Sequence, residues 1–380
     1  MKEFIKNSEV YSGRPMLKLN RRLVQGDYGL VFGSDKIWKN QRRFALHVLR
    51  DFGFGKPILE ETIVDQFIQM KDVLVKQNMK PIDMTKIIVT GVGNIIHQLT
   101  FNRTISMDDD YIFQFRNDLT LAKNDNLIEI IKKEIEDHKQ TVDYNSDPRD
   151  FIDAFLIEQK KHSGSDVIDG EWSDVQLVAA VYDLFSAGME TTSTSIRTFI
   201  LYMLNYPEIQ KKIHDEIDQI IGKDEIIKMA HLTKLPYFHA CLQEFQRHAN
   251  LAVINLPHRL TETVTLNGYT IPKNTTITPQ IPTIHYDDEH FINAEKFDPT
   301  RHLDENGQFV KNEKITPFSV GKRSCLGESL ARMEQFIFIA NLMQQFEFLP
   351  EKDNEIPKME FDSLFIKSPS LFKVRALVRK

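Results

Sequence analysis

The sequence predicts a mainly α-helical fold with a small β-sheet. Apolar residues recur at helical spacing through most of the chain up to Arg247, whereas the alternation typical of strands is confined to short segments after it. No repeat, low-complexity tract or linker interrupts the 380 residues. We therefore expect a single domain that spans 1–380.

The helical pattern is divided by glycine, proline and polar residues. Its periodicity predicts helices over 35–53, 59–76, 84–99, 127–139, 146–161 and 235–247. A longer helix is expected over 175–204, where apolar residues continue almost without a break until Pro207. Ser173 and Gln176 form a capping-box pattern at its start. Because this helix is apolar on most faces, we expect it to cross the core.

Strand signals are few and late in the chain. The segment VTLNGYTI at 264–271 predicts a hairpin, because Asn-Gly favours the tight turn between antiparallel strands. A further strand is expected at 275–278, after Pro272. The stretch 291–314 is rich in Asp, Asn and Pro and is expected to be irregular, and long loops of this kind are often functional.

Composition excludes several classes of protein. The chain has 48 Lys and Arg against 54 Asp and Glu, so we do not expect it to bind nucleic acid, which requires a basic surface. Two cysteines cannot form a disulfide framework. No segment has the length and apolarity of a transmembrane helix, so the chain as written is predicted to be soluble.

One of the two cysteines, Cys325, lies in the loop FSVGKRSCLG at 318–327, directly before an apolar helical segment. A cysteine at the N-terminus of a helix meets the positive end of the helix dipole, which lowers its pKa. The two glycines of the loop allow unusual backbone dihedral angles, and its lysine and arginine add positive charge. The loop is therefore suited to hold a thiolate.

The loop alone leaves several interpretations of Cys325 open. A zinc ligand would need further Cys or His residues at matching spacing, and none is present. A nucleophile would need a histidine partner, which the sequence does not exclude. An axial ligand of haem iron needs a single thiolate in a hydrogen-bonded loop. A buried structural cysteine needs nothing more, and the loop does not choose between these last two.

Further motifs decide the interpretation because they occur in a fixed order. They are WKNQR at 38–42, AGMETT at 187–192, EFQR at 244–247, FDPTRHL at 297–303 and the pattern Phe-x-x-Gly-x-Arg-x-Cys-x-Gly at 318–327. This ordered set resembles the cytochrome P450 family, and most closely its microsomal animal members. The resemblance implies the P450 fold and a haem b cofactor, iron protoporphyrin IX.

The resemblance also implies roles for individual residues around the haem. Cys325 matches the iron ligand, Phe318 the aromatic residue beside its sulfur, and Gly327 the glycine of the ligand loop. The side chains matched to the haem propionates are Trp38, Arg42, His258 and Arg323, with Arg259 as a further candidate.

On the opposite side of the haem, the resemblance implies a proton-delivery pair. Glu190 and Thr191 match the acid and the alcohol that pass protons to bound dioxygen. Ala187 and Gly188 match small residues that leave room for the oxygen. The alternative for these small residues is that they only allow close helix packing.

A structural ion network is implied as well. Glu244, Arg247 and Arg301 match the buried charges that anchor the segment before the ligand loop. His302 replaces the aromatic residue usual at its position, and we expect this change to loosen the network.

The implied partners are NADPH–cytochrome P450 reductase and cytochrome b5, at the cytoplasmic face of the endoplasmic reticulum. Four basic residues could form a docking patch for an acidic reductase domain: Lys39, Arg43, Arg50 and Lys322. The alternative is an ordinary solvated helix face.

Two segments usual in the family have no counterpart in the sequence. The match begins at 8–15, after the position of the membrane anchor, the first helix and the first strands, so the chain would be cytosolic if it is the whole product. A second gap falls at 124–126, where family members carry the helices that cover the substrate cavity. We therefore expect an incomplete P450 fold with a cavity open to water.

The implied function is a monooxygenase that inserts one atom of O2 into a lipophilic small molecule, such as a xenobiotic, a steroid or a fatty acid. The expected substrate contacts are the apolar segments 181–187, 251–254 and 364–371. One alternative is a non-catalytic haem-binding fragment or pseudoenzyme without a closed pocket. A cysteine hydrolase is the third possibility, but no histidine-centred motif supports it.

Overall fold

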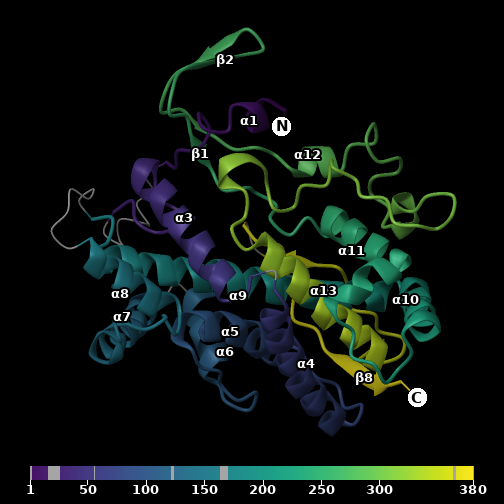
Figure 1. Cartoon of the computed structure of the whole chain (residues 1–380). Coiled ribbons are helices and arrows are strands. Elements are labelled where there is room, and N and C mark those ends of the chain that lie inside the picture. The colour runs from purple at the N-terminus through teal and green to yellow at the C-terminus, as the bar shows by residue number, and fades with distance from the viewer. Residues whose placement is uncertain are drawn as a thin grey trace.

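The structure, a computed structural model, describes residues 2–15, 26–54, 56–120, 124–162, 170–362 and 365–379. Helices form most of this part of the chain, and its strands are short and lie in the C-terminal half. The two ends of the chain lie far apart, with the N-terminus near α1 and the C-terminus beside β8 (Figure 1). Among the described residues, none of the helices combines the length and the apolarity needed to cross a membrane.

Most of the long helices follow the predicted periodicity, although α6 was not predicted and α8 begins later than the predicted 146. They are α1 (Lys2–Lys6), α3 (Asp35–Asp51), α4 (Pro57–Gln77), α5 (Thr85–Phe101), α6 (Tyr111–Thr120), α7 (Asn124–Thr141), α8 (Phe151–Lys161), α9 (Asp174–Asn205), α10 (Pro207–Ile220), α11 (Pro236–Ala249), α12 (Pro282–His285) and α13 (Glu328–Gln345). Short 3₁₀ helices are η1 (Met229–Lys234), η2 (Pro299–His302) and η3 (Gly321–Arg323). The predicted gap at 124–126 falls at the start of α7, and residues 121–123 lie outside the described part of the chain.

The long helix α9 runs through the centre of the molecule and packs against α5 and α13 (Figure 1). Ser173 caps it as predicted, because its hydroxyl accepts a hydrogen bond from the N–H of Gln176 at 3.2 Å. The return bond of a capping box is not found in the described part of the chain, where the N–H of Ser173 donates to the carbonyl of Gly170. The Gln176 side chain instead accepts a hydrogen bond from the N–H of Gly29 at 2.9 Å and so ties a distant loop to α9.

The strands form four antiparallel pairs in the described residues. The pairs are β1 (His258–Arg259) with β4 (Thr276–Ile277), β2 (Val264–Leu266) with β3 (Tyr269–Ile271), β5 (Phe346–Pro350) with β8 (Val374–Val378), and β6 (Phe361–Asp362) with β7 (Ser368–Pro369). In the predicted hairpin, Asn267 and Gly268 both have positive φ, 51° and 83°, as a two-residue hairpin turn requires. This hairpin projects from the top of the molecule in Figure 1.

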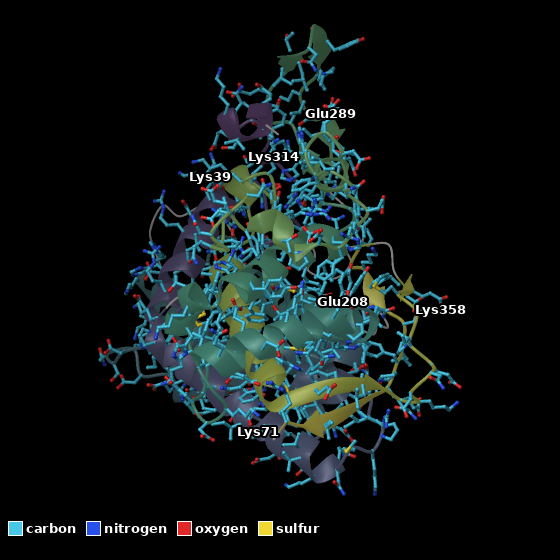
Figure 2. All side chains as sticks on the ribbon, turned by 90° about the vertical axis from the view of Figure 1, so that its right-hand side faces the viewer. Lys39, Lys71, Glu208, Glu289, Lys314 and Lys358 are labelled. Atoms are coloured by element: carbon cyan, nitrogen blue, oxygen red, sulfur yellow. The ribbon has the colours of Figure 1, made fainter. Side chains whose placement is uncertain are left out.

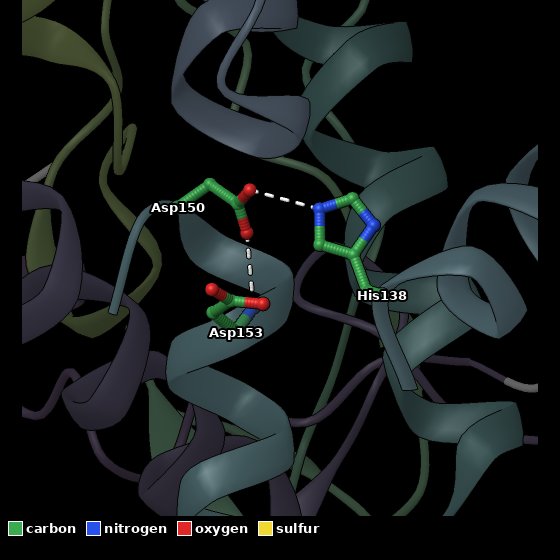
Figure 3. A group of neighbouring side chains, drawn as sticks. All are labelled: His138, Asp150 and Asp153. Atoms are coloured by element: carbon green, nitrogen blue, oxygen red, sulfur yellow. Dashed lines mark hydrogen bonds and ion pairs between the residues drawn. The ribbon is translucent and has the colours of Figure 1, made fainter. Parts of the chain in front are cut away.

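A buried polar cluster joins α7 to α8 (Figure 3). His138 Nε2 donates to an Asp150 carboxylate oxygen at 2.9 Å, and Asp150 caps α8 by accepting from the N–H of Asp153 at 2.9 Å. Burial alone would lower the pKa of His138, but the hydrogen bond and charge of Asp150 raise it above its usual value. Arg149 donates to both carboxylate oxygens of Asp153. Because every member already has a protein partner, the cluster is structural rather than a metal site.

Candidate functional site

The cysteine loop lies between η3 and α13. The N–H of Cys325 donates to the carbonyl of Phe318 at 2.9 Å, which closes the loop, and the Cys325 side chain is exposed. Gly321 has φ of 80°, and a Cβ there would lie 2.9 Å from Ser8 Cβ, so both the backbone and the space require glycine. Gly327 has an ordinary φ of −91°. The expectation of unusual dihedral angles therefore holds at Gly321 only.

The sequence predicts a lowered pKa for the Cys325 thiol, but the surroundings of the residue raise it. Although solvent reaches the side chain, the protein around it raises the pKa of the Cys325 thiol, and the charge of Glu328 adds to this effect. The N–H of Gly327 and the guanidinium groups of Arg42 and Arg332 lower the pKa by less. Cys325 lies three residues before Glu328, the first residue of α13, and the N–H of Gly327 at the start of that helix is the largest of the influences that lower the pKa.

A group of buried cations lies beside the loop. Burial lowers the pKa of Arg323 to about 8, and repulsion from Arg14, Arg42 and Arg259 adds to this shift. Burial and the charge of Arg42 lower the pKa of Arg14 to about 10. Burial, together with Arg14 and Arg323, lowers the pKa of His258 to about 3. The fold therefore concentrates positive charge here without enough carboxylates to balance it.

Backbone carbonyls and one aromatic ring hold the predicted members of this group in place. Arg323 donates from Nε to the carbonyl of Ser12 at 2.7 Å, and its guanidinium carbon lies 3.5 Å from the centre of the Trp38 ring. Arg42 donates to the carbonyl of Ser324 at 2.7 Å, so α3 holds the residue next to Cys325. The ring of His258, on β1, donates from Nδ1 to the carbonyl of Tyr11 at 2.7 Å.

Two donors in this group have no acceptor among the described residues. They are Trp38 Nε1 and Arg323 Nη1, and both atoms are buried. Buried donors without a partner are rare in folded proteins because each costs free energy. An anionic group rich in oxygen, such as a haem propionate, would both accept these hydrogen bonds and balance the charge. The residues present therefore fit a haem.

The sequence reasoning missed Arg14 as a member of this group. Arg14 is 6% exposed and donates to the carbonyls of Val31, Leu256 and Pro257. A single arginine in an irregular segment carries no periodic signal. Only the long-range bonds to Leu256 and Pro257 bring it to the site.

On α9, the predicted proton-delivery residues point to different partners. Thr191 Oγ1 donates to the carbonyl of Ala187 at 2.7 Å. Glu190 accepts two hydrogen bonds from Arg116 of α6, from Nε at 2.7 Å and from Nη2 at 2.9 Å. A Cβ on Gly188 would lie 2.7 Å from Ile96 Cδ1, so close packing against α5 explains the glycine.

The predicted ion network lies behind the loop, between α11 and η2. Glu244 is fully buried and accepts from Arg247 at 2.8 Å, from Arg301 at 2.9 Å and from the N–H of Asp298 at 3.0 Å. Burial raises the pKa of Glu244, but these donors outweigh it and hold the pKa at about 2. The expectation that His302 loosens the network is wrong, because its Nε2 donates to Glu244 at 2.9 Å.

The expected substrate segments are partly exposed. Ile254, Phe365 and Leu371 have 40%, 58% and 81% of their surface in solvent. Residue 364, the first of the segment 364–371, lies outside the described residues.

All four residues of the predicted docking patch are exposed. Lys39 forms an ion pair with Glu9, and Lys322 Nζ lies 3.9 Å from a Glu9 carboxylate oxygen. Arg43 and Arg50 have no ion pair within the described part of the chain. They therefore supply the stronger part of the positive surface.

Comparison with known proteins identifies the family and its fold. The family model described as cytochrome P450 matches residues 1–125 and 111–376. The chain belongs to the cytochrome P450 family. It is 33% identical to the probable cytochrome P450 CYP36A1 of Caenorhabditis elegans over 410 residues, which cover 99% of this chain and 83% of that protein.

Other P450 relatives are equally similar. The chain is 34% identical to cytochrome P450 2C3 of Oryctolagus cuniculus, over 97% of this chain and 81% of that protein. It is 36% identical to cytochrome P450 2J1 of the same species, over 97% of this chain and 78% of that protein. These relatives are P450s of the microsomal type, so the predicted family and the mainly helical P450 fold are confirmed. Membership in this family makes the chain a monooxygenase with a haem cofactor.

Proposed function

We propose that this P450 inserts one oxygen atom from O2 into a lipophilic small molecule, with electrons that come from NADPH through a reductase. The observation that carries the proposal is the cysteine loop beside two buried donors without acceptors, Trp38 Nε1 and Arg323 Nη1. A loop that presents one cysteine next to an unbalanced group of cations suits a haem better than it suits a hydrolase or a zinc site.

We propose Cys325 as the axial ligand of a haem b, whose iron supplies the activation of dioxygen when the cofactor is bound. The carbonyl of Phe318 holds the Cys325 N–H, and Arg42 holds the carbonyl of Ser324. These two bonds fix the loop from both sides. A Cβ at Gly327 would meet no atom within 4 Å, so the chain leaves open space at this position of the loop.

The propionates of the haem are proposed to bind the buried cation group. Arg323 and Trp38 each have a free donor for them, and Arg14, Arg42 and His258 surround these donors. This assignment extends the predicted set by one residue, Arg14.

Glu190 and Thr191 are proposed to deliver protons on the opposite side. They are neighbours on α9, the helix that crosses the core. The Thr191 hydroxyl, now bound to the carbonyl of Ala187, can turn to accept or donate without a change in the backbone.

The exposed apolar side chains of Ile254, Phe365 and Leu371 support a lipophilic substrate, such as a xenobiotic, a steroid or a fatty acid. The microsomal character of the relatives supports NADPH–cytochrome P450 reductase and cytochrome b5 as partners, and the cytoplasmic face of the endoplasmic reticulum as the location.

The purified full chain tests this proposal. We expect it to contain haem, to show the absorption of a thiolate-ligated haem when reduced under carbon monoxide, and to consume NADPH faster with a lipophilic substrate in the presence of reductase. Haem binding without any NADPH consumption would favour the non-catalytic alternative. Absence of haem would overturn the proposal.

A further inference from the structure

A groove, here called the α10 groove, lies between α10 and the paired strands β5 and β8, on the right of Figure 1. Its volume is about 530 Å³, and it is open to solvent on one side. Sites for small organic molecules commonly have volumes in this range. None of the described residues that line the α10 groove belongs to the cysteine loop, the cation group or the expected substrate segments. The α10 groove is therefore separate from the site described above.

The α10 groove presents apolar surface to solvent. Four apolar residues that line it are exposed or half-buried: Pro207, Leu349, Pro350 and Ile356. Ile356 alone has 52% of its surface in solvent. A ligand with a hydrocarbon part would remove this surface from water, which is favourable.

Buried contacts hold α10 against β5 and fix the shape of the α10 groove. Gln210 of α10 donates from Nε2 to the carbonyl of Phe348 at 3.1 Å and accepts from the N–H of the same residue at 2.8 Å. The ring of His214, one turn further along α10, donates to the carbonyl of Phe346. These contacts lie on either side of Glu347 in β5, so the residues around Glu347 are held in place without a ligand.

Two hydrogen-bond acceptors of the α10 groove have no donor among the described residues. The first is Nε2 of His214, a side chain that is 8% exposed. Burial and the charge of Arg379 lower the pKa of His214 to about 4, so the ring is neutral at pH 7. Because its other nitrogen donates to Phe346, Nε2 carries a lone pair. The second acceptor is the half-buried carboxylate of Glu347, the residue after Phe346.

The cations that line the α10 groove are, by contrast, already paired. Lys211 Nζ donates to both carboxylate oxygens of Asp215, at 2.9 and 2.6 Å. Arg379 donates to Asp218 at 2.6 Å and to two backbone carbonyls. An anionic ligand would have to displace these carboxylates, whereas a cationic ligand with N–H donors would meet acceptors that have no partner.

We propose that the α10 groove is a second binding site of this protein and that its ligand is a lipophilic primary amine. The ammonium group donates to the Glu347 carboxylate and to His214 Nε2, and the hydrocarbon part covers Pro350 and Ile356. The inference goes beyond the proposed function and does not depend on it, because none of these residues takes part in the proposed haem site.

Photoaffinity labelling of the full chain tests where the amine binds. The probe is a phenylalkylamine that carries a diazirine on its ring, and mass spectrometry identifies the labelled peptides. We expect saturable labelling within 203–215 and 346–356. Labelling confined to the expected substrate segments, 181–187, 251–254 and 364–371, would overturn the inference, and so would labelling of the α10 groove that does not saturate.

A matched pair of substitutions tests the carboxylate. Glu347→Gln keeps the size of the side chain but removes its charge, so we expect the probe concentration for half-maximal labelling to rise about ten-fold, as for the loss of one charge-assisted hydrogen bond. The control is Glu351→Gln, the same change at an exposed residue just after β5 that does not line the α10 groove. It should label like the wild type. Equal labelling of the two variants would overturn the inference.

The alcohol that corresponds to the amine tests the charge of the ligand. It has the same hydrocarbon part, but it lacks the ammonium group. We expect it to compete with the probe in the wild type only at about ten-fold higher concentration than the amine does. Equal competition by the alcohol and the amine would overturn the assignment of an amine. Because none of these measurements uses haem, they stand whether or not the proposed function holds.

Discussion

Among single residues, Arg323 shows how the fold prepares for an anion. Its Nε and Nη2 hold the carbonyls of Ser12 and Gly33, whereas Nη1 is buried without an acceptor in the described part of the chain. Backbone carbonyls therefore hold the side chain in place, and Nη1 is the donor that we propose for the cofactor.

Replacing Arg323 by lysine should weaken haem retention. Lysine keeps the charge but loses the planar set of donors, so one charge-assisted hydrogen bond to the cofactor is lost. A bond of this kind contributes about 2 kcal/mol, so we expect haem loss to be about ten- to a hundred-fold faster. Transfer of haem to an excess of a haem-acceptor protein measures the rate. Lys322→Gln, an exposed change in the same loop, is the control; equal rates for both variants would contradict the assignment of Arg323.

Asp183 of α9 is a second residue whose burial leads to a testable prediction. Its carboxylate accepts from the N–H groups of Leu30 and Val31, at 2.6 and 2.8 Å, and is 6% exposed. Burial raises its pKa from 3.8 to about 7, and the two N–H groups offset this only in part. Asp183 therefore holds the loop before α3 against α9. Ionisation of the buried carboxyl group costs free energy in the folded protein.

The pH dependence of stability follows from this shift. The folded state binds the proton of Asp183 more tightly than the unfolded state, so its contribution is complete below pH 3.8 and is lost as the pH rises through about 7. Each unit of pKa shift corresponds to about 1.4 kcal/mol. We expect the unfolding free energy of the wild type, relative to Asp183→Asn, to fall by a few kcal/mol across this range. Urea unfolding at several pH values measures it, and a constant difference would argue against a protonated Asp183.

At the scale of elements, the ion network couples α11 to the irregular segment before the cysteine loop. Glu244 binds Arg247 within α11 and reaches Arg301 and His302 of η2. One carboxylate thus joins η2 to α11, in addition to the few backbone hydrogen bonds within the segment.

Replacing Glu244 by glutamine should destabilise the protein by about 3–5 kcal/mol, because the buried Arg247 and the half-buried Arg301 lose their counter-charge. Hydrogen exchange should also become faster in residues 291–314, while α4 and α5 keep their protection. Urea unfolding and hydrogen exchange measure the two effects. An unchanged exchange rate in 291–314 would mean that other contacts anchor this segment.

For some helices and strands, the local sequence pattern is sufficient to predict the element, and for others it is not. Helices such as α3, α4 and α9 follow from periodicity, because each buries one face or most of its surface against neighbours. The pair of β5 and β8 was missed. Strand β5 follows α13 directly, and its partner among the described residues lies at Val374–Val378, so nothing local marks it as a strand. Helix α6, a short helix of ten residues, was also missed.

Local sequence pattern also predicts only part of the candidate site. Motif resemblance placed Cys325, Arg323 and Trp38 near one another, and the structure brings these residues together at the cysteine loop. It could not supply Arg14 or Arg116, because each acquires its role only from a contact with a distant segment.

For the whole molecule, the distribution of charge suggests how electrons arrive. Figure 2 places Lys39 near the upper end of the molecule and Lys71 at the lower end, so the proposed patch has a distant counterpart for comparison. Arg43 and Arg50 of α3 are exposed on the helix that also carries Trp38 and Arg42. A partner bound there would lie close to the proposed haem site.

Charge reversal tests this docking surface. We expect Arg43→Glu with Arg50→Glu to slow reduction by the reductase several-fold at low salt, and much less at high salt, because exposed charges are screened. Stopped-flow reduction under carbon monoxide measures the rate. Lys71→Glu with Lys76→Glu on α4 is the matched control. If both double variants are reduced at the same rate, the patch is an ordinary solvated surface.

The most direct test of the whole account is the replacement of one sulfur by oxygen. We expect Cys325→Ser to lose the carbon-monoxide absorption of a thiolate-ligated haem, whereas Cys241→Ala, a change at the buried second cysteine in α11, keeps it. Absorption that is the same in Cys325→Ser and in the wild type would contradict the central claim that Cys325 binds the iron.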